Sequence, residues 1–329
     1  MGSEMCIRDR NFDNASVLGE NDTHVVDLSG YGNNGTVYGD INDADSGFTT
    51  GKYGKAMEFD GSGDYASLGD VLNNVDLPVT ISAWVKIPSG GGGPLFSSDT
   101  VTTDTGNYYG FRMSVDEDGI ALEYGDGTGA GSEDRRTGVD NNGNINTGAW
   151  THVLGIIKGA TNMEFYINGI DSGPGSYSGS GGSMVHNSYS AYVGLWGRWG
   201  PSYFNGLIDE VRIYNRSLSA SEVQELYYSN LYKYDTDRWQ LYVNQSLDGD
   251  GENYSFFASE TNSSGTEFLT ETRTITADFP LVLTIVSPEG KSYKNTTASG
   301  ASIDFNVSLD QDGDTCCLLY TSDAADELD

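Results

Sequence analysis

The sequence predicts an all-β protein built as a β-sandwich, and three observations lead to this fold class. Glycine is abundant, with 44 of 329 residues, as is typical of many short strands joined by turns. Several runs alternate apolar and polar residues, which places every second side chain on one face of a strand. Runs with the helical period are scarce, so only one short helix is predicted.

Two alternating runs are predicted to supply core strands. The run VTISAWVKI places one set of apolar side chains on a single face: Val79, Ile81, Ala83, Val85 and Ile87. The run MEFYINGI does the same with Met163, Phe165 and Ile167. WTHVLGIIKG and AYVGLW predict further strands, and residues 116–119 (DEDG) and 167–169 (ING) predict hairpin turns.

One short helix is predicted after residue 218. Ser219 can cap its first turn together with Glu222, in the spacing of a capping box, and Leu218 can contact Val223 across that turn. The helix is expected to close the first domain, which we assign to residues 11–232.

The later part of the chain is predicted to form smaller β modules. RWQLYVNQS, NYSFFASET and FLTETRTITADF give three strands within residues 233–279. LVLTIVSPEG and SIDFNVSLD then begin a further domain, residues 280–316, which the end of the sequence truncates.

Both terminal segments are interpreted as translated sequencing adaptor. Residues 1–10 (MGSEMCIRDR) contain the peptide that the adaptor-like DNA GGC TCG GAG ATG TGT ATA AGA GAC encodes, and residues 317–329 begin with a peptide that its reverse-complement end encodes. The alternative is a pair of natural but unusual tails. Adaptor peptides, like tags, are excluded from fold reasoning. On this interpretation the natural N-terminus is missing, so an export signal is not visible.

Charge, cysteines and sequons restrict the function classes. The formal charge of −31 opposes binding to nucleic acid and to anionic lipid and attracts cations. No apolar run is long enough to span a bilayer, so no membrane contact is predicted. The three cysteines lie in or beside the adaptor segments, which leaves no disulfide pattern. Nine Asn-x-Ser/Thr sequons favour an exported protein at the cell surface or outside the cell.

Four motifs carry a resemblance to a known family. They are DLSGYGNNGTVYG, GKAMEFDGSGDYASLG, the pair WTHV and FYINGI, and FNGLIDEVRIYNRSLSASEVQELY. In this order they resemble the LamG-like domain of the concanavalin A-like lectin/glucanase superfamily. The resemblance implies a jelly-roll β-sandwich with one short C-terminal helix. TETRTITADF and VSPEG resemble, more weakly, the immunoglobulin-like repeats of archaeal and metagenomic surface proteins.

Asp209 in GLIDEVRIYN is predicted to be a buried carboxylate. Strict alternation places it in phase with Leu207, Val211 and Ile213, and so points it into the apolar layer. An isolated buried charge is costly. Asp209 is therefore expected to be paired with a cation, hydrogen-bonded by backbone amides, or bound to a metal.

The family resemblance implies a structural calcium between the N-terminal loop and this strand. Its candidate ligands are Asp27, Asn34, Asp60 and Asp209. Oxygen ligands from turns suit the flexible coordination of calcium. The alternative is that Asp27 and Asp60 are turn formers bonded to local backbone, and that Asp209 caps a loop.

Catalysis is not predicted for this chain. Glucanases of the superfamily carry a Glu-x-Asp-x-x-Glu strand whose carboxylates act as nucleophile and acid, and no such strand is present. The three histidines, His24, His152 and His186, do not stand beside a serine elbow. His152 is expected to be a packed structural residue.

A binding role is predicted at LWGRWGPSYF. Trp196, Arg198, Trp199 and Tyr203 are the candidate ligand-binding residues, because aromatic faces stack on sugar rings while arginine donates hydrogen bonds. Tyr108 and Tyr109 are weaker candidates, and either tryptophan could instead fold back onto the sandwich edge. The predicted function is a non-catalytic module that binds a glycan or a glycosylated surface partner. The alternatives are a structural spacer and an accessory module of a larger glycoside hydrolase.

Overall fold

The chain divides into two compact units, Met1–Tyr227 and Tyr228–Asp329. The computed structural model describes residues 8–10, 12–29, 31–40, 47–99, 107–129, 134–140, 144–145, 147–197, 201–235 and 238–246, and beyond these six strands between residues 253 and 322. Side chains are described only within residues 12–230.

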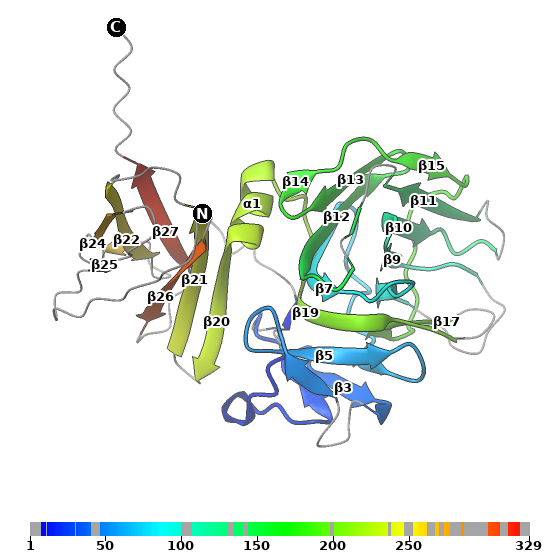
Figure 1. Cartoon of the computed structure of the whole chain (residues 1–329). Coiled ribbons are helices and arrows are strands. Elements are labelled where there is room, and N and C mark those ends of the chain that lie inside the picture. Colours follow the sequence, from blue (N-terminus) through cyan, green and yellow to red (C-terminus); the bar gives the residue numbers. More distant parts are fainter. Residues whose placement is uncertain are drawn as a thin grey trace, which may run out of the picture. The chain divides into compact units, whose positions relative to one another are not determined.

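The first unit is built from two antiparallel sheets (Figure 1). One sheet has eight strands. Along its main path they are β14 (Ile170–Asp171), β13 (Asn162–Ile167), β12 (Thr151–Gly159), β7 (Val79–Lys86), β19 (Asn205–Tyr214), β5 (Lys55–Asp60) and β4 (Phe48–Thr50). The eighth, β1 (Arg8–Arg10), pairs with β19 beside this path.

The other sheet has nine strands. In spatial order they are β15 (Ser176–Ser178), β11 (Arg135–Val139), β10 (Gly119–Gly125), β9 (Phe111–Asp116), β8 (Gly93–Ser97), β16 (Ala191–Val193), β6 (Tyr65–Gly69), β3 (Gly35–Tyr38) and β2 (His24–Val25). A short 3-10 helix, Ser16–Leu18, precedes β2. The two predicted hairpin turns are confirmed, since β9 and β10 flank residues 117–118 and β13 and β14 flank residues 168–169.

The apolar core lies between the two sheets. The four predicted core residues of β7 and Ile87 directly after it belong to this core. Met163 and Phe165 of β13 belong to it as well, with Ile167 packed against it. Phenylalanines supply much of the volume, and Phe59, Phe96 and Phe111 are fully buried. The alternation in these strands therefore predicts correctly which side chains face inward.

β19 departs from strict alternation because it contains a bulge. Glu210 has a left-handed backbone with φ of 52°, and the register against β7 shifts between Asp209 and Arg212. The extra residue changes the phase of the strand. Val211 and Ile213 still face the core, but Asp209 lies opposite Trp84, on the outward face of the sheet. The predicted direction of Asp209 is therefore wrong, while its predicted burial is confirmed at 0 % exposure.

The single described α-helix, α1 (Ala220–Tyr228), covers part of the eight-stranded sheet. The capping box is present: the Ser219 amide donates to Glu222 Oε2 at 2.7 Å and the Glu222 amide donates to Ser219 Oγ at 3.4 Å. Leu218 and Val223 bury themselves in one apolar cluster with residues of β12 and β13. The predicted helix start is thus confirmed.

The predicted strand AYVGLW is two strands. Gly194 separates β16 from β17 (Leu195–Gly197) with a φ of 79°, a conformation that favours glycine. β17 pairs with β18 (Pro201–Tyr203) in a two-stranded ribbon. A Cβ at Gly194 would lie 2.2 Å from the Phe59 ring. Glycine therefore allows both the turn and the close approach of this ribbon to the core.

The second unit contains two small antiparallel sheets. One consists of β20 (Ser229–Asp235), β21 (Arg238–Ser246) and β26 (Ser302–Leu309). The other consists of β23 (Glu267–Leu269), β22 (Asn253–Thr261), β24 (Arg273–Thr276), β25 (Thr284–Ile285) and β27 (Thr315–Ser322). Strands from residues 280–316 thus pair with strands from residues 233–279. The immunoglobulin-like assignment of this region stays a prediction.

The segments interpreted as adaptor also contain strands. β1 falls within residues 1–10, and most of β27 falls within residues 317–329. β1 pairs with β19, and β27 pairs with β22. No strand is predicted from the sequence in these segments, because they are interpreted as adaptor and excluded.

Candidate functional site

The outward face of the nine-stranded sheet carries a row of polar and aromatic side chains from seven strands. Their register runs directly across the sheet: Thr137, Glu123, Arg112, Ser97, Tyr192, Ser67 and Thr36. In β9, β10, β16 and β6 the residues on either side of them, such as Met113, Leu122 and Val193, belong to the core. Because side chains alternate across a strand, the row must face away from the core.

One end of this face carries a cluster that we call the arginine–aromatic cluster: Tyr108, Arg112, Glu123, Arg135 and Trp196. The Tyr108 and Trp196 rings are stacked, with centroids 6.3 Å apart. The Arg112 guanidinium lies 3.9 Å above the Trp196 ring and forms an ion pair with Glu123. Arg135 lies 4.7 Å above the Tyr108 ring and 3.6 Å from Glu123. Cation–π contacts and one shared carboxylate therefore fix the orientation of both rings.

The arginine–aromatic cluster is a surface and not a deep pocket. The cavity between its side chains is only about 20 Å³, roughly the space of one water molecule. Trp196 and Tyr108 are half-buried, so one ring surface of each is held by the cluster while the remainder faces solvent. Such a surface suits a ligand that lies across it.

The same face carries a second group of rings, the tyrosine cluster of Tyr38, Tyr65, Tyr192 and Tyr203. Tyr38 and Tyr65 are stacked at 4.9 Å, and Tyr192 meets Tyr65 edge-on at 5.6 Å. Tyr203 of β18 lies 6.5 Å from Tyr65. Burial raises the pKa of the Tyr65 hydroxyl, and the neighbouring tyrosines add to the rise. Tyr38 is 43 % exposed, so its ring is the most open of the four.

Two of the four predicted ligand-binding residues lie on this face. Trp196 belongs to the arginine–aromatic cluster and Tyr203 to the tyrosine cluster, and their strands β17 and β18 form one ribbon. The structure thus links the two clusters through the predicted segment. Arg198 and Trp199 lie outside the described residues.

Sequence reasoning did not single out Tyr38, Tyr65, Tyr192, Arg112 or Arg135. A usable signal was present: in YASLG and FRMSVD the polar or aromatic residues alternate with core residues, which marks an outward face. The pairing order of these strands was the missing information, because it joins residues far apart in the sequence.

The predicted calcium ligands are held mainly by local hydrogen bonds. Asp27 accepts from the amides of Ser29 and Asn33, and Asn34 accepts from the amide of Asp27. Asp60 accepts from the Ser62 amide at 2.6 Å. These are the bonds expected of turn formers. Asp27 and Asn34 therefore share one loop, while Asp60 is the last residue of β5, at the start of a separate turn.

Asp209 is held by a different loop. Its Oδ2 accepts from the amides of Lys52 and Tyr53, at 2.8 and 3.1 Å. Asp13 accepts from the Lys55 amide of the same loop at 2.7 Å. Burial raises the pKa of Asp209, and the nearby Glu210 raises it further. Burial likewise raises the pKa of Asp13 to about 7.

An unpaired oxygen of Asp209 favours a cation beside it, but the positions of the four predicted calcium ligands do not support a single site. Asp209 Oδ1 is buried without a hydrogen-bond partner, and a buried carboxylate oxygen in that state requires a donor or a cation. Among the described side chains, however, no three His, Cys, Asp or Glu residues group closely enough to hold a metal ion. Asp27, Asn34, Asp60 and Asp209 thus do not fit calcium as one ligand set.

A buried serine–histidine contact lies elsewhere in the first unit. Ser82 Oγ and His152 Nε2 are 2.9 Å apart. The Trp84 and Tyr227 rings lie 5.2 and 6.1 Å from the imidazole. Burial lowers the pKa of His152 to about 3, and the imidazole is only 2 % exposed. A base that no substrate can reach does not serve nucleophilic catalysis.

These features define a two-sheet β-sandwich with an aromatic, polar outward face. A match to the family described as concanavalin A-like lectin/glucanases superfamily extends over residues 60–224, about half of the chain. The chain belongs to this superfamily, which confirms the predicted jelly-roll domain.

Solved structures show limited similarity. Domain 4 of an extracellular GH43 arabinanase from Geobacillus stearothermophilus, in complex with arabinotriose, is 26 % identical, with 67 % of this chain and 97 % of that chain covered and a TM-score of 0.46. The receptor-binding domain of botulinum neurotoxin C/D mosaic serotype is 12 % identical, with 84 % and 71 % covered and a TM-score of 0.48. No curated protein matches the sequence.

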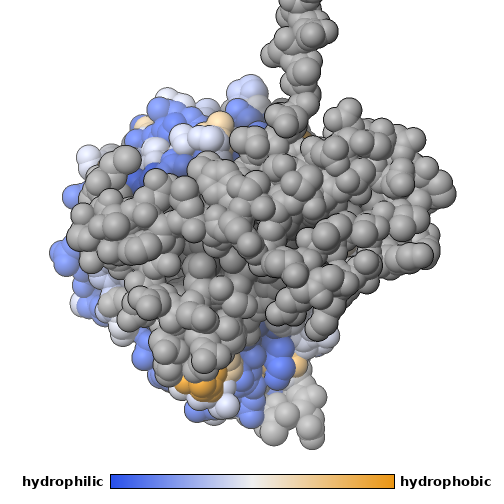
Figure 2. All heavy atoms as spheres, turned by 90° about the vertical axis from the view of Figure 1, so that its left-hand side faces the viewer, coloured by the Kyte–Doolittle hydropathy of each residue, from blue (hydrophilic) through white to orange (hydrophobic). Residues whose placement is uncertain are grey.

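In the part of the chain that the structure describes, neither a membrane-spanning helix nor a large group of neighbouring exposed apolar side chains is found. Within the described residues, no helix is long and apolar enough to cross a membrane. Figure 2 shows that the coloured residues on the visible side are mainly hydrophilic, with small hydrophobic spots. Exposed large apolar side chains such as Val17 and Ile170 lie in separate elements, and single apolar residues of this kind are normal on a protein surface.

Proposed function

We propose that this chain is a non-catalytic carbohydrate-binding module, and that its ligand lies across the outward face of the nine-stranded sheet. The observation that supports this most is the presence of two aromatic clusters on one outward face of a domain from the lectin/glucanase superfamily. The ligand is a glycan, either free or attached to a glycoprotein.

The chemistry of the face matches sugar rings. The C–H faces of a sugar pack on aromatic rings, and Trp196 and Tyr38 offer partly exposed rings for this purpose. Arg112, Arg135 and Ser67 stand nearby as hydrogen-bond donors for sugar hydroxyls. The near absence of a pocket favours several adjacent sugar units over one enclosed small molecule.

The glycan is expected outside the cell. Nine sequons and the strongly acidic composition support an exported protein. The charge of −31 also disfavours nucleic acid and anionic membranes as partners. A structural spacer without a ligand remains the competing function, and an accessory role in a larger glycoside hydrolase is compatible with glycan binding.

A glycan-array screen of the full chain tests the proposal. We expect binding to a defined set of oligosaccharides, reduced roughly tenfold or more by Trp196→Ala, because truncating one stacking ring costs about 1–3 kcal/mol of binding energy. Tyr65→Ala is expected to act similarly, since its ring contacts the other three tyrosines of its cluster.

Tyr31→Ala is the matched control. Tyr31 is 57 % exposed and belongs to neither cluster, so its loss is expected to leave the array pattern unchanged. A blank array for the folded wild-type chain would favour the spacer. Equal binding by the wild type and by Trp196→Ala and Tyr65→Ala would exclude this face as the site.

A further inference from the structure

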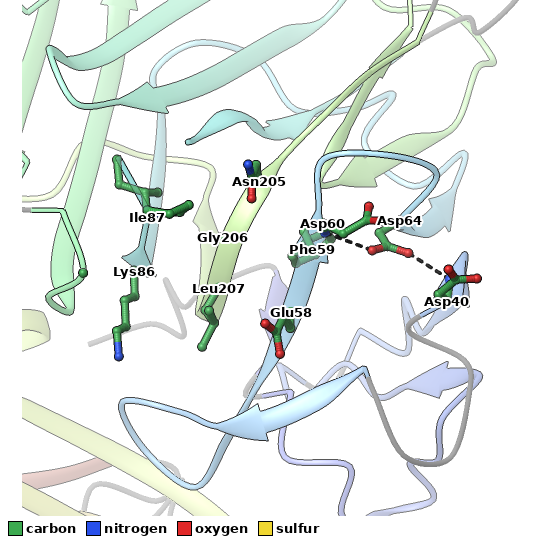
Figure 3. Close-up of a pocket in the computed structure, with 12 residues that line it drawn as sticks. Asp40, Glu58, Phe59, Asp60, Asp64, Lys86, Ile87, Asn205, Gly206 and Leu207 are labelled. Carbon is green, nitrogen blue, oxygen red and sulfur yellow. Dashed lines mark hydrogen bonds between the residues drawn. The ribbon is translucent and has the colours of Figure 1, made fainter. Parts of the chain in front are cut away.

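A large cavity of the first unit lies on its other sheet. It has a volume of about 670 Å³ and opens at one end of the eight-stranded sheet, between β5, β7 and β19 (Figure 3). A volume of this size is typical of small-molecule sites. Its lining comes from sheet and loop residues that neither aromatic cluster uses.

Three adjacent strands place a cation, an apolar side chain and an anion side by side along the cavity. Leu207 of β19 lies opposite Lys86 of β7 on one side and opposite Glu58 of β5 on the other. Lys86 and Glu58 are therefore two strand spacings apart, about 10 Å between backbones. Neither forms an ion pair in the described part of the chain. Both charged groups are thus available to a ligand.

The opposite wall is acidic and rigid. Asp64 is buried, and its two carboxylate oxygens accept from the amides of Asp40 and Asp60, at 2.9 and 3.0 Å (Figure 3). Burial raises the pKa of Asp64. The Asp60 carboxylate is exposed beside it and Asp40 is exposed at the rim. Asp64 therefore fixes the backbone of this wall, while the exposed Asp60, whose carboxylate also accepts from the Ser62 amide, lines the cavity.

The floor between these walls is close-packed backbone and apolar surface. Asn205 lies opposite Asp60 in the register and brings an amide to the cavity. Gly206 has a φ of 137°, and a Cβ there would lie 2.7 Å from the Lys86 carbonyl oxygen. Leu207, Ile87 and Pro88 supply apolar surface. No aromatic ring other than the buried Phe59 lines the cavity.

We propose that this cavity is a second ligand site and that it binds an amino sugar with a free amine. Glu58 and Asp60 would hold the ammonium group, and Lys86 and Asn205 would donate hydrogen bonds to hydroxyl oxygens. Leu207 and Pro88 would contact the apolar edge of the ring.

The charge balance of the cavity favours an amine over a neutral or acidic sugar. Lys86 is the single cation among its lining residues, against four carboxyl side chains, Asp40, Glu58, Asp60 and Asp64. An acidic ligand would meet repulsion from these groups, and a neutral sugar would offer no charge to Glu58 and Asp60, whose carboxylates are exposed. A simple cation without hydroxyls would leave Lys86 and Asn205 unused. A sugar that carries both an amine and hydroxyls can pair its ammonium group with the carboxylates and its hydroxyl oxygens with Lys86 and Asn205.

Titration calorimetry of the full chain with glucosamine, glucose and N-acetylglucosamine tests the proposal. We expect glucosamine to bind and the two neutral sugars to bind at least roughly tenfold more weakly, because hydrogen bonds between charged groups are stronger than those between neutral groups. Glu58→Gln and Asp60→Asn are each expected to weaken glucosamine binding by a similar factor. Lys86→Met is expected to weaken it less, because its hydrogen bond goes to a neutral oxygen.

Glu225→Gln is the matched control, because it removes the same charge at an exposed position of α1. It is expected to leave glucosamine binding unchanged. Equal binding of glucose and glucosamine, or equal binding of methylamine, would overturn the proposal. So would unchanged glucosamine affinity in Glu58→Gln and Asp60→Asn. The glycan-array pattern of Glu58→Gln is expected to stay intact, so a failure here is separable from a failure of the aromatic face.

Discussion

At the scale of single residues, Asp209 combines complete burial with an incomplete set of hydrogen bonds. Two loop amides satisfy Oδ2, and Oδ1 has no partner. The sequence predicts that this carboxyl needs compensation, and backbone amides supply part of it. The sequence cannot reveal which loop supplies them, because Lys52 and Tyr53 are about 155 positions away along the chain.

A cation is expected to complete the surroundings of Asp209. We predict that calcium raises the melting temperature of the wild-type chain relative to chelator, because a ligand that binds only the folded state stabilises it. Asp209→Asn is expected to remove this difference, and Asp60→Asn is expected to preserve it. Differential scanning calorimetry with and without chelator measures both. Identical wild-type melting in the two buffers would exclude a stabilising calcium.

His152 is expected to make folding sensitive to acid. Burial lowers its pKa from 6.5 to about 3, so between these values the unfolded chain binds a proton that the folded chain does not. The contribution of His152 to stability then falls as the pH drops below about 6.5, by up to about 1.4 kcal/mol per pH unit. Asp13, whose pKa is raised to about 7, contributes in the opposite direction, so a His152 variant is needed for comparison. Urea unfolding at pH 7 and pH 5 measures the loss.

The comparison with His152→Gln isolates this contribution. The variant is expected to be less stable at both pH values, because it disturbs the contact with Ser82, and to lose less stability between pH 7 and pH 5 than the wild type. Val17→Ala, at an exposed position without a titrating group, serves as control and is expected to keep the wild-type pH dependence. Identical pH dependence in wild type and His152→Gln would contradict the prediction.

At the scale of elements, α1 is specified by its own sequence. Ser219, Glu222 and the Leu218–Val223 contact all act within one turn, so the sequence alone predicts where the helix begins. Ser219→Ala is expected to lower the free energy of unfolding by about 1 kcal/mol, because it leaves a helix N-terminal amide without its cap.

Denaturant unfolding measures this change, and Ser221→Ala provides the comparison. Ser221 lies inside α1, where alanine has the higher helix propensity. We expect that variant to be neutral or slightly stabilising. An equal loss in both variants would argue against a capping role for Ser219.

Strands were predictable where their pattern is regular and not where it is interrupted. β7 and β13 follow the expected alternation, whereas the bulge at Glu210 and the break at Gly194 change the phase or end a strand. The alternation of apolar and polar residues in the sequence reveals neither the bulge nor the break. The aromatic face depends further on pairing between distant strands, such as Ser67 with Tyr192. The sequence therefore predicts individual aromatic residues of the site, but not that they lie together on one face of the sheet.

At the scale of the whole molecule, the net charge of −31 opposes the folded state. Like charges on a compact surface repel one another, and salt screens this repulsion. We predict that sodium chloride raises the melting temperature by several degrees between about 10 and 300 mM, even with chelator present. A flat response would mean that local pairs, such as Arg112 with Glu123, already offset the repulsion.

The strand β1 has a consequence for how the molecule behaves when shortened. Its three residues pair with Val211, Arg212 and Ile213 of β19, beside the place where β5 pairs with the first half of β19. The backbone forms this ladder, so residues of any type with an extended backbone can fill it. A chain that starts at residue 11 leaves this length of β19 uncovered. An uncovered strand edge is a template for another chain, so the shortened protein is expected to self-associate in light scattering, while three retained residues of neutral sequence keep it monodisperse.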